Sequence, residues 1–260
     1  MTVPINTTQL AFWNQQAKAI FLADIPKDPR HTEPWPYAPI FVGAAGEGAH
    51  GAALYAEGMD AYDIDGDGRP DLLAGNYCLK YQGGNAFKPI KVGIIGGRIK
   101  AGRFKPGKYP QIVIAPGDGS GPLMIYECIG SPENPEDWKG TRLLDRDMIH
   151  GHTLEIADID GDGNLDIFAA EQGNWTRERN ALDNPDASAW IFTVTAKAPF
   201  ALPCSPGARD GMTAKLLTWM ATAISIFSNI PKHGMRPAST SGCRVVPVRC
   251  APGSRRQFPP

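Results

Sequence analysis

The stretch that decides the fold is DIDGDGRPD at residues 63–71, and a near copy, DIDGDGNLD, occupies residues 158–166. Each copy carries four carboxylates within nine residues. Like charges at this density repel one another unless a cation lies between them. Side-chain oxygens at positions 1, 3, 5 and 9 and a backbone carbonyl at position 7 form the kind of ligand set that Ca²⁺ takes, whereas Mg²⁺ demands stricter geometry and retains its waters. The sequence therefore predicts two calcium loops.

A competing interpretation is that these residues only make hairpin turns, because Asp-Gly pairs are common turn residues. Two complete copies in one chain favour metal binding over chance turns. The glycines would let the backbone wrap tightly around an ion. The predicted ligands of the first loop are Asp63, Asp65, Asp67, Asp71 and the Arg69 carbonyl, and those of the second are Asp158, Asp160, Asp162, Asp166 and the Asn164 carbonyl.

The residues around the loops predict a repeated hairpin of short strands. Residues 101–115 align with residues 61–75 at a shift of 40, but this middle copy has Arg103, Lys105, Gly107 and Gln111 in place of the acids. We therefore expect it to keep the hairpin and to have lost the metal. Units of short strands at spacings of 40 and 55 residues predict an all-β fold, specifically a β-propeller. Strands are expected at residues 58–62, 72–75, 88–95, 123–128, 167–170 and 189–192.

The two segments GMDAYDIDGDGRPDLLAGN, residues 58–76, and GHTLEIADIDGDGNLDIFAAE, residues 151–171, resemble FG-GAP/VCBS repeats. These repeats are the integrin-type calcium-binding blades of seven-bladed β-propellers, and the resemblance covers residues 58–192. It implies a calcium-stabilised module with a binding or structural role toward carbohydrate or protein, and a secreted or periplasmic location. Fewer blades are legible than such a ring needs, so we expect an incomplete propeller. The amino terminus shows no signal peptide.

A second, shorter resemblance points to an enzyme. Residues 98–104 and the segment leading into His152 are similar to the amino-terminal propeller of fungal aldos-2-ulose dehydratases, which implies a carbon–oxygen lyase acting on sugars. His150, His152 and Glu171 would then be the base and acid of a β-elimination, with Trp175 as a stacking platform. The alternative is that the histidines only hydrogen-bond neighbouring loops and that Trp175 covers a blade edge.

Four residues after the first return strand have a similar ambiguity. Polar and aromatic side chains at this position would suit carbohydrate binding, and they are equally usual in loops. The residues concerned are Asn76, Tyr77, Lys80 and Tyr81.

Composition divides the chain into three parts. Residues 1–57 predict an irregular, proline-rich leader, with residues 17–23 as a short strand or helix, and residues 58–192 hold the blades. The last part, residues 193–260, carries one acid and nine bases, whereas residues 1–192 carry 26 acids and 17 bases. The total net charge of −1 gives no reason to expect nucleic acid or membrane as a partner.

The genetic code offers an explanation for the basic tail. Trp219-Met220-Ala221 must be encoded TGG ATG GCN, and reading two bases later forces GAT GGC, which encodes Asp-Gly. Across residues 217–226 the shifted triplets are compatible with DLDGDGDIDI. We therefore predict a frameshift at or just after Phe192, with a genuine disordered basic tail as the alternative. The coding nucleotides test this: stop codons in the second frame, or no third acidic loop there, would refute the frameshift.

Overall fold

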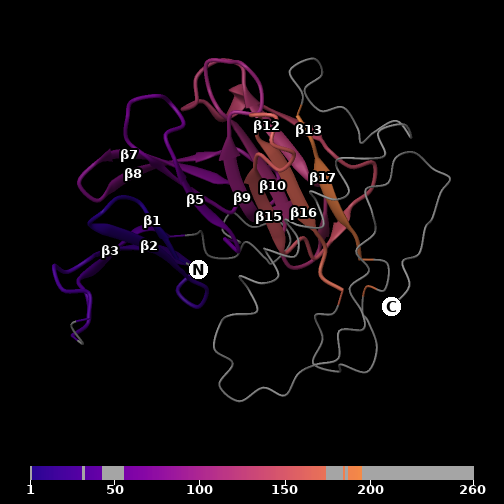
Figure 1. Ribbon diagram of the computed structural model, residues 1–260. Helices are drawn as coiled ribbons and strands as arrows, with labels where there is room; N and C mark the ends of the chain where they lie inside the picture. The colour runs from indigo at the N-terminus through magenta and orange to yellow at the C-terminus, as the bar shows by residue number, and fades with distance from the viewer. Residues whose placement is uncertain (1, 31–32, 43–55, 174–183, 185–186, 195–260) are drawn as a thin grey trace. The chain divides into compact units, whose positions relative to one another are not determined.

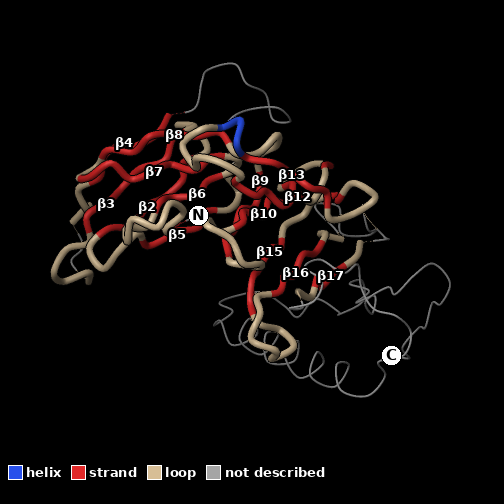
Figure 2. Tube along the Cα trace, turned by 90° about the horizontal axis from the view of Figure 1, so that it is seen from above, coloured by secondary structure: helices blue, strands red, loops and turns tan. Residues whose placement is uncertain are grey.

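The fold is seen in a computed structural model that describes residues 2–30, 33–42, 56–173, 184 and 187–194. The described chain is built of antiparallel β-strands, with one turn of 3-10 helix at Pro135–Asp137 and no α-helix among these residues (Figures 1 and 2). The chain divides into two compact units, residues 1–155 and 156–260. The predicted frameshifted tail, apart from residues 193 and 194, lies outside the described residues.

The first unit contains three four-stranded antiparallel sheets, in each of which the strands follow one another along the chain. The first sheet comprises β1 (Thr2–Pro4), β2 (Gln9–Asn14), β3 (Ala19–Asp24) and β4 (Tyr37–Val42). The second comprises β5 (Met59–Tyr62), β6 (Asp71–Ala74), β7 (Tyr77–Gly83) and β8 (Ala86–Lys91). The third comprises β9 (Gly97–Gly102), β10 (Gln111–Pro116), β12 (Met124–Cys128) and β13 (Trp138–Arg142).

Two shorter sheets complete the strand inventory of the described residues. A two-stranded ribbon pairs β11 (Ser120–Gly121) with β14 (Met148–Ile149). The second unit holds a three-stranded sheet of β15 (Thr153–Ala157), β16 (Asp166–Ala170) and β17 (Ala189–Phe192), whose first strand starts just before the unit boundary.

The core of the first unit lies between neighbouring sheets. Successive side chains of a strand point to opposite faces, and in β6 both faces are covered, so all four of its residues are buried. Leu72 joins a cluster with Ile20 and Leu22 of the first sheet, whereas Leu73 joins a cluster with Ile99 and Ile112 of the third. The second sheet is therefore a blade that has a neighbour on each face. The all-β propeller fold predicted from the repeats is confirmed.

The prediction of an irregular leader at residues 1–57 is wrong for its described part, which forms the four-stranded first sheet. The prolines misled the prediction. Proline cannot donate to a strand ladder, but it is tolerated in edge strands and bulges. Pro4 ends edge strand β1, and Pro39 lies in edge strand β4 beside a register shift at Ile20 and Phe21. The strand alternative for residues 17–23 is confirmed by β3.

One side chain fixes the hairpin at the same place in all three repeats. The Oδ2 atom of Asp71 accepts a hydrogen bond from the Ile64 N–H at 3.2 Å, and Asp166 Oδ2 accepts from the Ile159 N–H at 2.9 Å. In the middle repeat Gln111 replaces the acid, and its Oε1 accepts from the Phe104 N–H at 2.9 Å. We call this contact the hairpin lock. It explains why residues 97–116 keep the predicted hairpin without the acids.

We expect Gln111→Ala to destabilise the protein by about 2 to 4 kcal/mol. Gln111 is 2% exposed, and its Oε1 also accepts from the Lys105 N–H at 3.2 Å. The substitution leaves two amides without their acceptor, each worth about 1 to 3 kcal/mol when buried. Urea unfolding measures the change. The matched control is Gln82→Ala on the exposed part of β7, expected within about 0.5 kcal/mol of the parent. Equal losses in the two variants would contradict the lock.

Candidate metal centres

The first acidic loop joins β5 to β6 and gathers three of its carboxylates. One oxygen each from Asp63, Asp65 and Asp67 lies within 4.8 Å of the others. The backbone turns this tightly because Gly66 and Gly68 have φ values of +81° and +85°, which are favourable only for glycine. The arrangement could hold a metal ion.

Backbone amides organise the loop around Asp63. Its Oδ1 accepts from the Gly66 N–H at 2.8 Å and from the Asp67 N–H at 3.1 Å, and its Oδ2 accepts from the Gly68 N–H at 2.9 Å. These donors offset part of the carboxylate repulsion. They also fix the direction in which Asp63 presents its charge, so the loop keeps its shape without relying on an ion for every contact.

Asp71 has a different position from the other predicted ligands of this loop. It is 3% exposed, and its Oδ1 accepts from the Tyr81 N–H at 2.9 Å while its Oδ2 closes the hairpin lock. Burial raises the pKa of Asp71 to about 6, against the opposing effect of these amides. Asp71 therefore anchors the loop, and it lies outside the group of three acids whose oxygens come closest together.

The second acidic loop, between β15 and β16, repeats this geometry closely. Asp158 Oδ1 accepts from the Gly161 N–H at 2.7 Å and its Oδ2 from the Gly163 N–H at 3.0 Å. The two glycines again have positive φ, +77° and +90°. Here the three oxygens within 4.8 Å belong to Asp158, Asp160 and Asp166. Two loops with one internal hydrogen-bond pattern thus each gather acids that could hold a metal ion.

Position 7 of each loop is the residue predicted to give a backbone carbonyl. It also donates hydrogen bonds to the acid at position 5. The Arg69 N–H donates to Asp67 Oδ1 at 2.9 Å, and its guanidinium Nη2 donates to Asp67 Oδ2 at 2.7 Å. The side-chain bond is the main reason that the pKa of Asp67 lies below its ordinary value. In the second loop the Asn164 N–H donates to Asp162 Oδ1 at 2.8 Å and lowers the pKa of Asp162.

The first loop also has a cation of its own. Lys80 Nζ lies 2.5 Å from Asp65 Oδ2 and 2.7 Å from Glu133 Oε1, and its side chain is only 18% exposed. Hydrogen bonds from Lys80 and then Lys88 lower the pKa of Glu133 to about 2. The Lys80 ammonium must therefore share Asp65 with any metal ion that enters the loop.

The four residues considered for carbohydrate binding each make contacts within the protein. Asn76 is 1% exposed and donates to the Gly93 carbonyl at 3.1 Å. The Tyr77 ring packs 5.1 Å from that of Phe41. Tyr81 packs against Phe87 at 5.4 Å, and Lys80 belongs to the ion pairs just described. Tyr77, Lys80 and Tyr81 lie in strand β7, so the alternative that all four are loop residues is wrong for these three.

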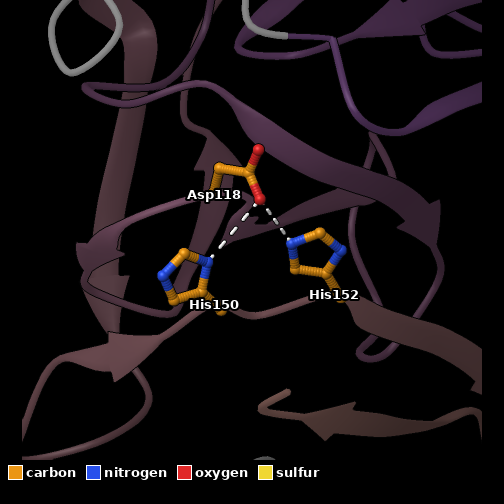
Figure 3. Close-up of side chains that lie close together, drawn as sticks. All are labelled: Asp118, His150 and His152. Atoms are coloured by element: carbon orange, nitrogen blue, oxygen red, sulfur yellow. Dashed lines mark hydrogen bonds and ion pairs between the residues drawn. The ribbon is translucent and has the colours of Figure 1, made fainter. Parts of the chain in front are cut away.

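A third cluster brings together the two histidines singled out from the sequence. His152 Nε2 lies 2.8 Å from Asp118 Oδ1, and His150 Nδ1 lies 3.6 Å from the same oxygen (Figure 3). Glu57 Oε2 is 3.8 Å from His152 Nε2. We call these four residues the histidine cluster. It is formed by the turn after β10, the segment between β14 and β15, and the residue preceding β5 by two positions.

The histidine cluster is held by a strained and crowded backbone. His150 has a φ of +49°, one of two positive values found at non-glycine positions in the described chain. Its N–H donates to the Gly119 carbonyl at 2.7 Å, and the Gly119 N–H donates back to His150 Nδ1 at 3.3 Å. A side chain at Gly117 would collide with the Glu57 carboxylate. These contacts leave the cluster little freedom to rearrange.

The remaining predicted site residues are accounted for as follows. Glu171 is 6% exposed in the second unit, and its Oε2 accepts from the Ser188 N–H at 3.0 Å. Trp175 lies outside the described residues. The sequence interpretation missed Asp118 and Glu57. Asp118 lies between Gly117 and Gly119, and this glycine-rich context is typical of a hairpin turn and gives no signal of a binding role.

Searches with protein-family models and among curated proteins find no match to this chain. Within the described residues, no helix is both long enough and apolar enough to cross a membrane. The residues of the acidic loops and of the histidine cluster are therefore the basis on which function can be argued.

We expect Lys80→Gln to tighten metal binding at the first loop roughly five- to tenfold, because it removes a positive charge in contact with Asp65. Calorimetric titration with Ca²⁺, in an Asp160→Asn background that disables the second loop, measures the effect. Lys88→Gln is the matched control, since Lys88 contacts Glu133 and makes no contact with a loop acid in the described residues. Equal affinities in the two variants would show that Lys80 does not compete with the ion.

Proposed function

We propose that this protein is a calcium-stabilised β-propeller module of the FG-GAP/VCBS type, with a binding or structural role toward carbohydrate or another protein. The observation that carries the proposal is the near identity of the two acidic loops. In both, position 1 accepts amide hydrogen bonds from positions 4 and 6, and position 9 closes the hairpin lock. The same local design at two places is difficult to explain by turn formation alone.

Calcium suits these loops better than magnesium does. The donors are carboxylate oxygens and backbone carbonyls spread over nine residues, which favours a large ion with flexible coordination. Mg²⁺ would need near-ideal octahedral geometry with several retained waters. An ion between the acids would remove the repulsion that the backbone amides offset only in part, and it would stiffen the turn between the first two strands of a blade.

A binding role is supported by an aromatic cluster on the first sheet. Phe12 and Phe21 are cross-strand partners stacked at 5.3 Å, and Tyr37 meets them edge-on at 5.7 and 5.6 Å. Tyr37 is 62% exposed. Phe12 and Phe21 lie on the sheet face opposite to Ala11 and Ile20, which enter the core. Half-exposed rings of this kind offer flat apolar contact area to a sugar or to a protein side chain.

The calcium proposal predicts two Ca²⁺ ions per chain by calorimetry and a higher melting temperature in calcium than in chelator. An ion at a hundred times its Kd stabilises the folded state by about 2.7 kcal/mol. Asp63→Asn and Asp158→Asn should each abolish one site. Asp147→Asn, which changes a half-exposed acid outside both loops, should leave two. A melting temperature indifferent to calcium would overturn the proposal.

A second candidate function, a carbon–oxygen lyase acting on sugars, is supported by the short contact of His152 with Asp118. A carboxylate can orient an imidazole that removes a proton next to a carbonyl group. Formation of an unsaturated ketone from a keto sugar, followed by ultraviolet absorbance and lost in His152→Gln, would establish this activity. The absence of turnover on such sugars would leave the binding role.

A further inference from the structure

We propose that Lys80 couples ion binding at the first acidic loop to the contact between the second and third blades. Its ammonium contacts Asp65 in the loop and Glu133 in the third blade. A metal ion beside Asp65 would repel the ammonium from that acid and leave it to Glu133. Lys80 can act in this way only if the calcium site proposed above exists, so the coupling rests on that proposed function.

Lys80 bridges two acids that belong to different blades. Its Nζ lies 2.5 Å from Asp65 Oδ2 and 2.7 Å from Glu133 Oε1. Lys80 is on β7 of the second sheet, whereas Glu133 lies between β12 and β13 of the third sheet. The side chains of Lys80 and Asp65 are only 18% and 13% exposed, so solvent screens their contact less than that of a surface ion pair. One ammonium thus interacts with the loop and with the neighbouring blade at once.

Glu133 is carried by a turn that is anchored in the core. The Nε1 atom of Trp138 donates to the Pro132 carbonyl at 3.1 Å, and Trp138 belongs to the buried cluster formed by residues of the second and third sheets. A second lysine holds the other carboxylate oxygen, because Lys88 Nζ from β8 lies 2.7 Å from Glu133 Oε2. A change in the contact between Lys80 and Glu133 therefore acts on a turn that is fixed to the core of both blades.

The middle repeat carries the same pair with its charges exchanged. Lys105 stands at position 3 of its loop, where the first loop has Asp65. The third strand pairs with the second in the same register in both blades, so Glu127 of β12 corresponds to Lys80 of β7. Lys105 Nζ lies 2.5 Å from Glu127 Oε2. An ion pair between position 3 and the third strand is thus common to both repeats, and in the first repeat its cation also has a partner in the next blade.

Removal of Glu133 and removal of Lys80 should have opposite effects on ion binding. Without the Glu133 charge, the ammonium keeps Asp65 as its acid partner in the described residues and opposes an entering cation more strongly. Coupling is reciprocal, so an ion that favours the contact of Lys80 with Glu133 is itself favoured by that contact to the same extent. Glu133 also attracts a cation directly, and this effect does not need Lys80. A double-mutant cycle separates the two effects.

The test is calorimetric titration with Ca²⁺ of the full chain carrying Asp160→Asn, which disables the second loop. Glu133→Gln should weaken calcium binding about fivefold, at the lower end of known coupling factors. In the Lys80→Gln background the same substitution should weaken binding less than about twofold, because the ammonium that carries the coupling is gone. Glu136→Gln is the matched control. Glu136 is an exposed acid of the same turn and makes no ion pair in the described residues, so its loss should leave the affinity unchanged.

A second readout follows the third blade itself. The Ser131 N–H donates to Asp137 Oδ2 at 2.8 Å, and the Glu133 N–H donates to Ser131 Oγ at 3.3 Å. Both amides therefore report on the turn that carries Glu133. Calcium should slow their hydrogen exchange in the Asp160→Asn protein and leave it unchanged once Lys80→Gln is added.

The outcomes distinguish the coupling from the calcium site on which it rests. The coupling is refuted, and the calcium site stands, if Glu133→Gln binds calcium as tightly as Glu136→Gln does. The same conclusion follows if Glu133→Gln weakens binding by one factor with and without Lys80, or if calcium slows exchange in the turn equally in both backgrounds. If the Asp160→Asn protein binds no calcium, the first-loop site and the coupling are both wrong. Circular dichroism of each variant verifies the fold.

Discussion

The hairpin lock is the contact on which the described repeats depend. A buried side-chain oxygen at the start of the second strand accepts the amide seven residues earlier, and this closes a nine-residue loop without a tight turn. Buried amides need an acceptor, and a loop of this length has few backbone acceptors within reach. The side-chain oxygen therefore accepts an amide hydrogen bond that, in a two-residue hairpin, a backbone carbonyl of the strand ladder would accept. In the first repeat the same carboxylate also accepts from the Tyr81 amide of β7, so it joins the loop after β5 to β6 and β7.

The second constraint is that a blade has two apolar faces. Adjacent residues of β6 enter different cores, so the second blade buries its apolar side chains only with a neighbour on each face. Packing between sheets then supplies the stability that an isolated four-stranded sheet would lack. The candidate sites lie at the ends of the strands, where the loops do not have to fill the core between sheets. One end carries the acidic loop, and the other carries the turns that bring Asp118 and Glu57 toward the histidines.

Much of this was predictable from sequence, for physical reasons that differ between residues. The acidic loops and their flanking strands were found because all their determinants lie within about fifteen residues. β17 was predicted at its observed bounds, Ala189–Phe192. The composition changes directly after it, where the basic segment begins, and this marked the end of the strand. The first blade was missed because its prolines lie in edge strands, and sequence alone does not reveal which strands are edges. Asp118, Glu57 and Lys80 were missed as partners because they meet their contacts across 15 to 95 residues of chain.

Gln111 shows that the hairpin lock needs a side-chain oxygen at this position but does not need a negative charge. The Gln111 amide oxygen accepts the same backbone hydrogen bond as the Asp71 carboxylate, so the middle hairpin keeps its fold without the acids. The proposed ion binding is in this sense separable from the hairpin itself. Blades of this design could therefore differ in the number of acidic loops they carry, and with it in the proposed dependence on ions in the surrounding medium, while the architecture stays the same.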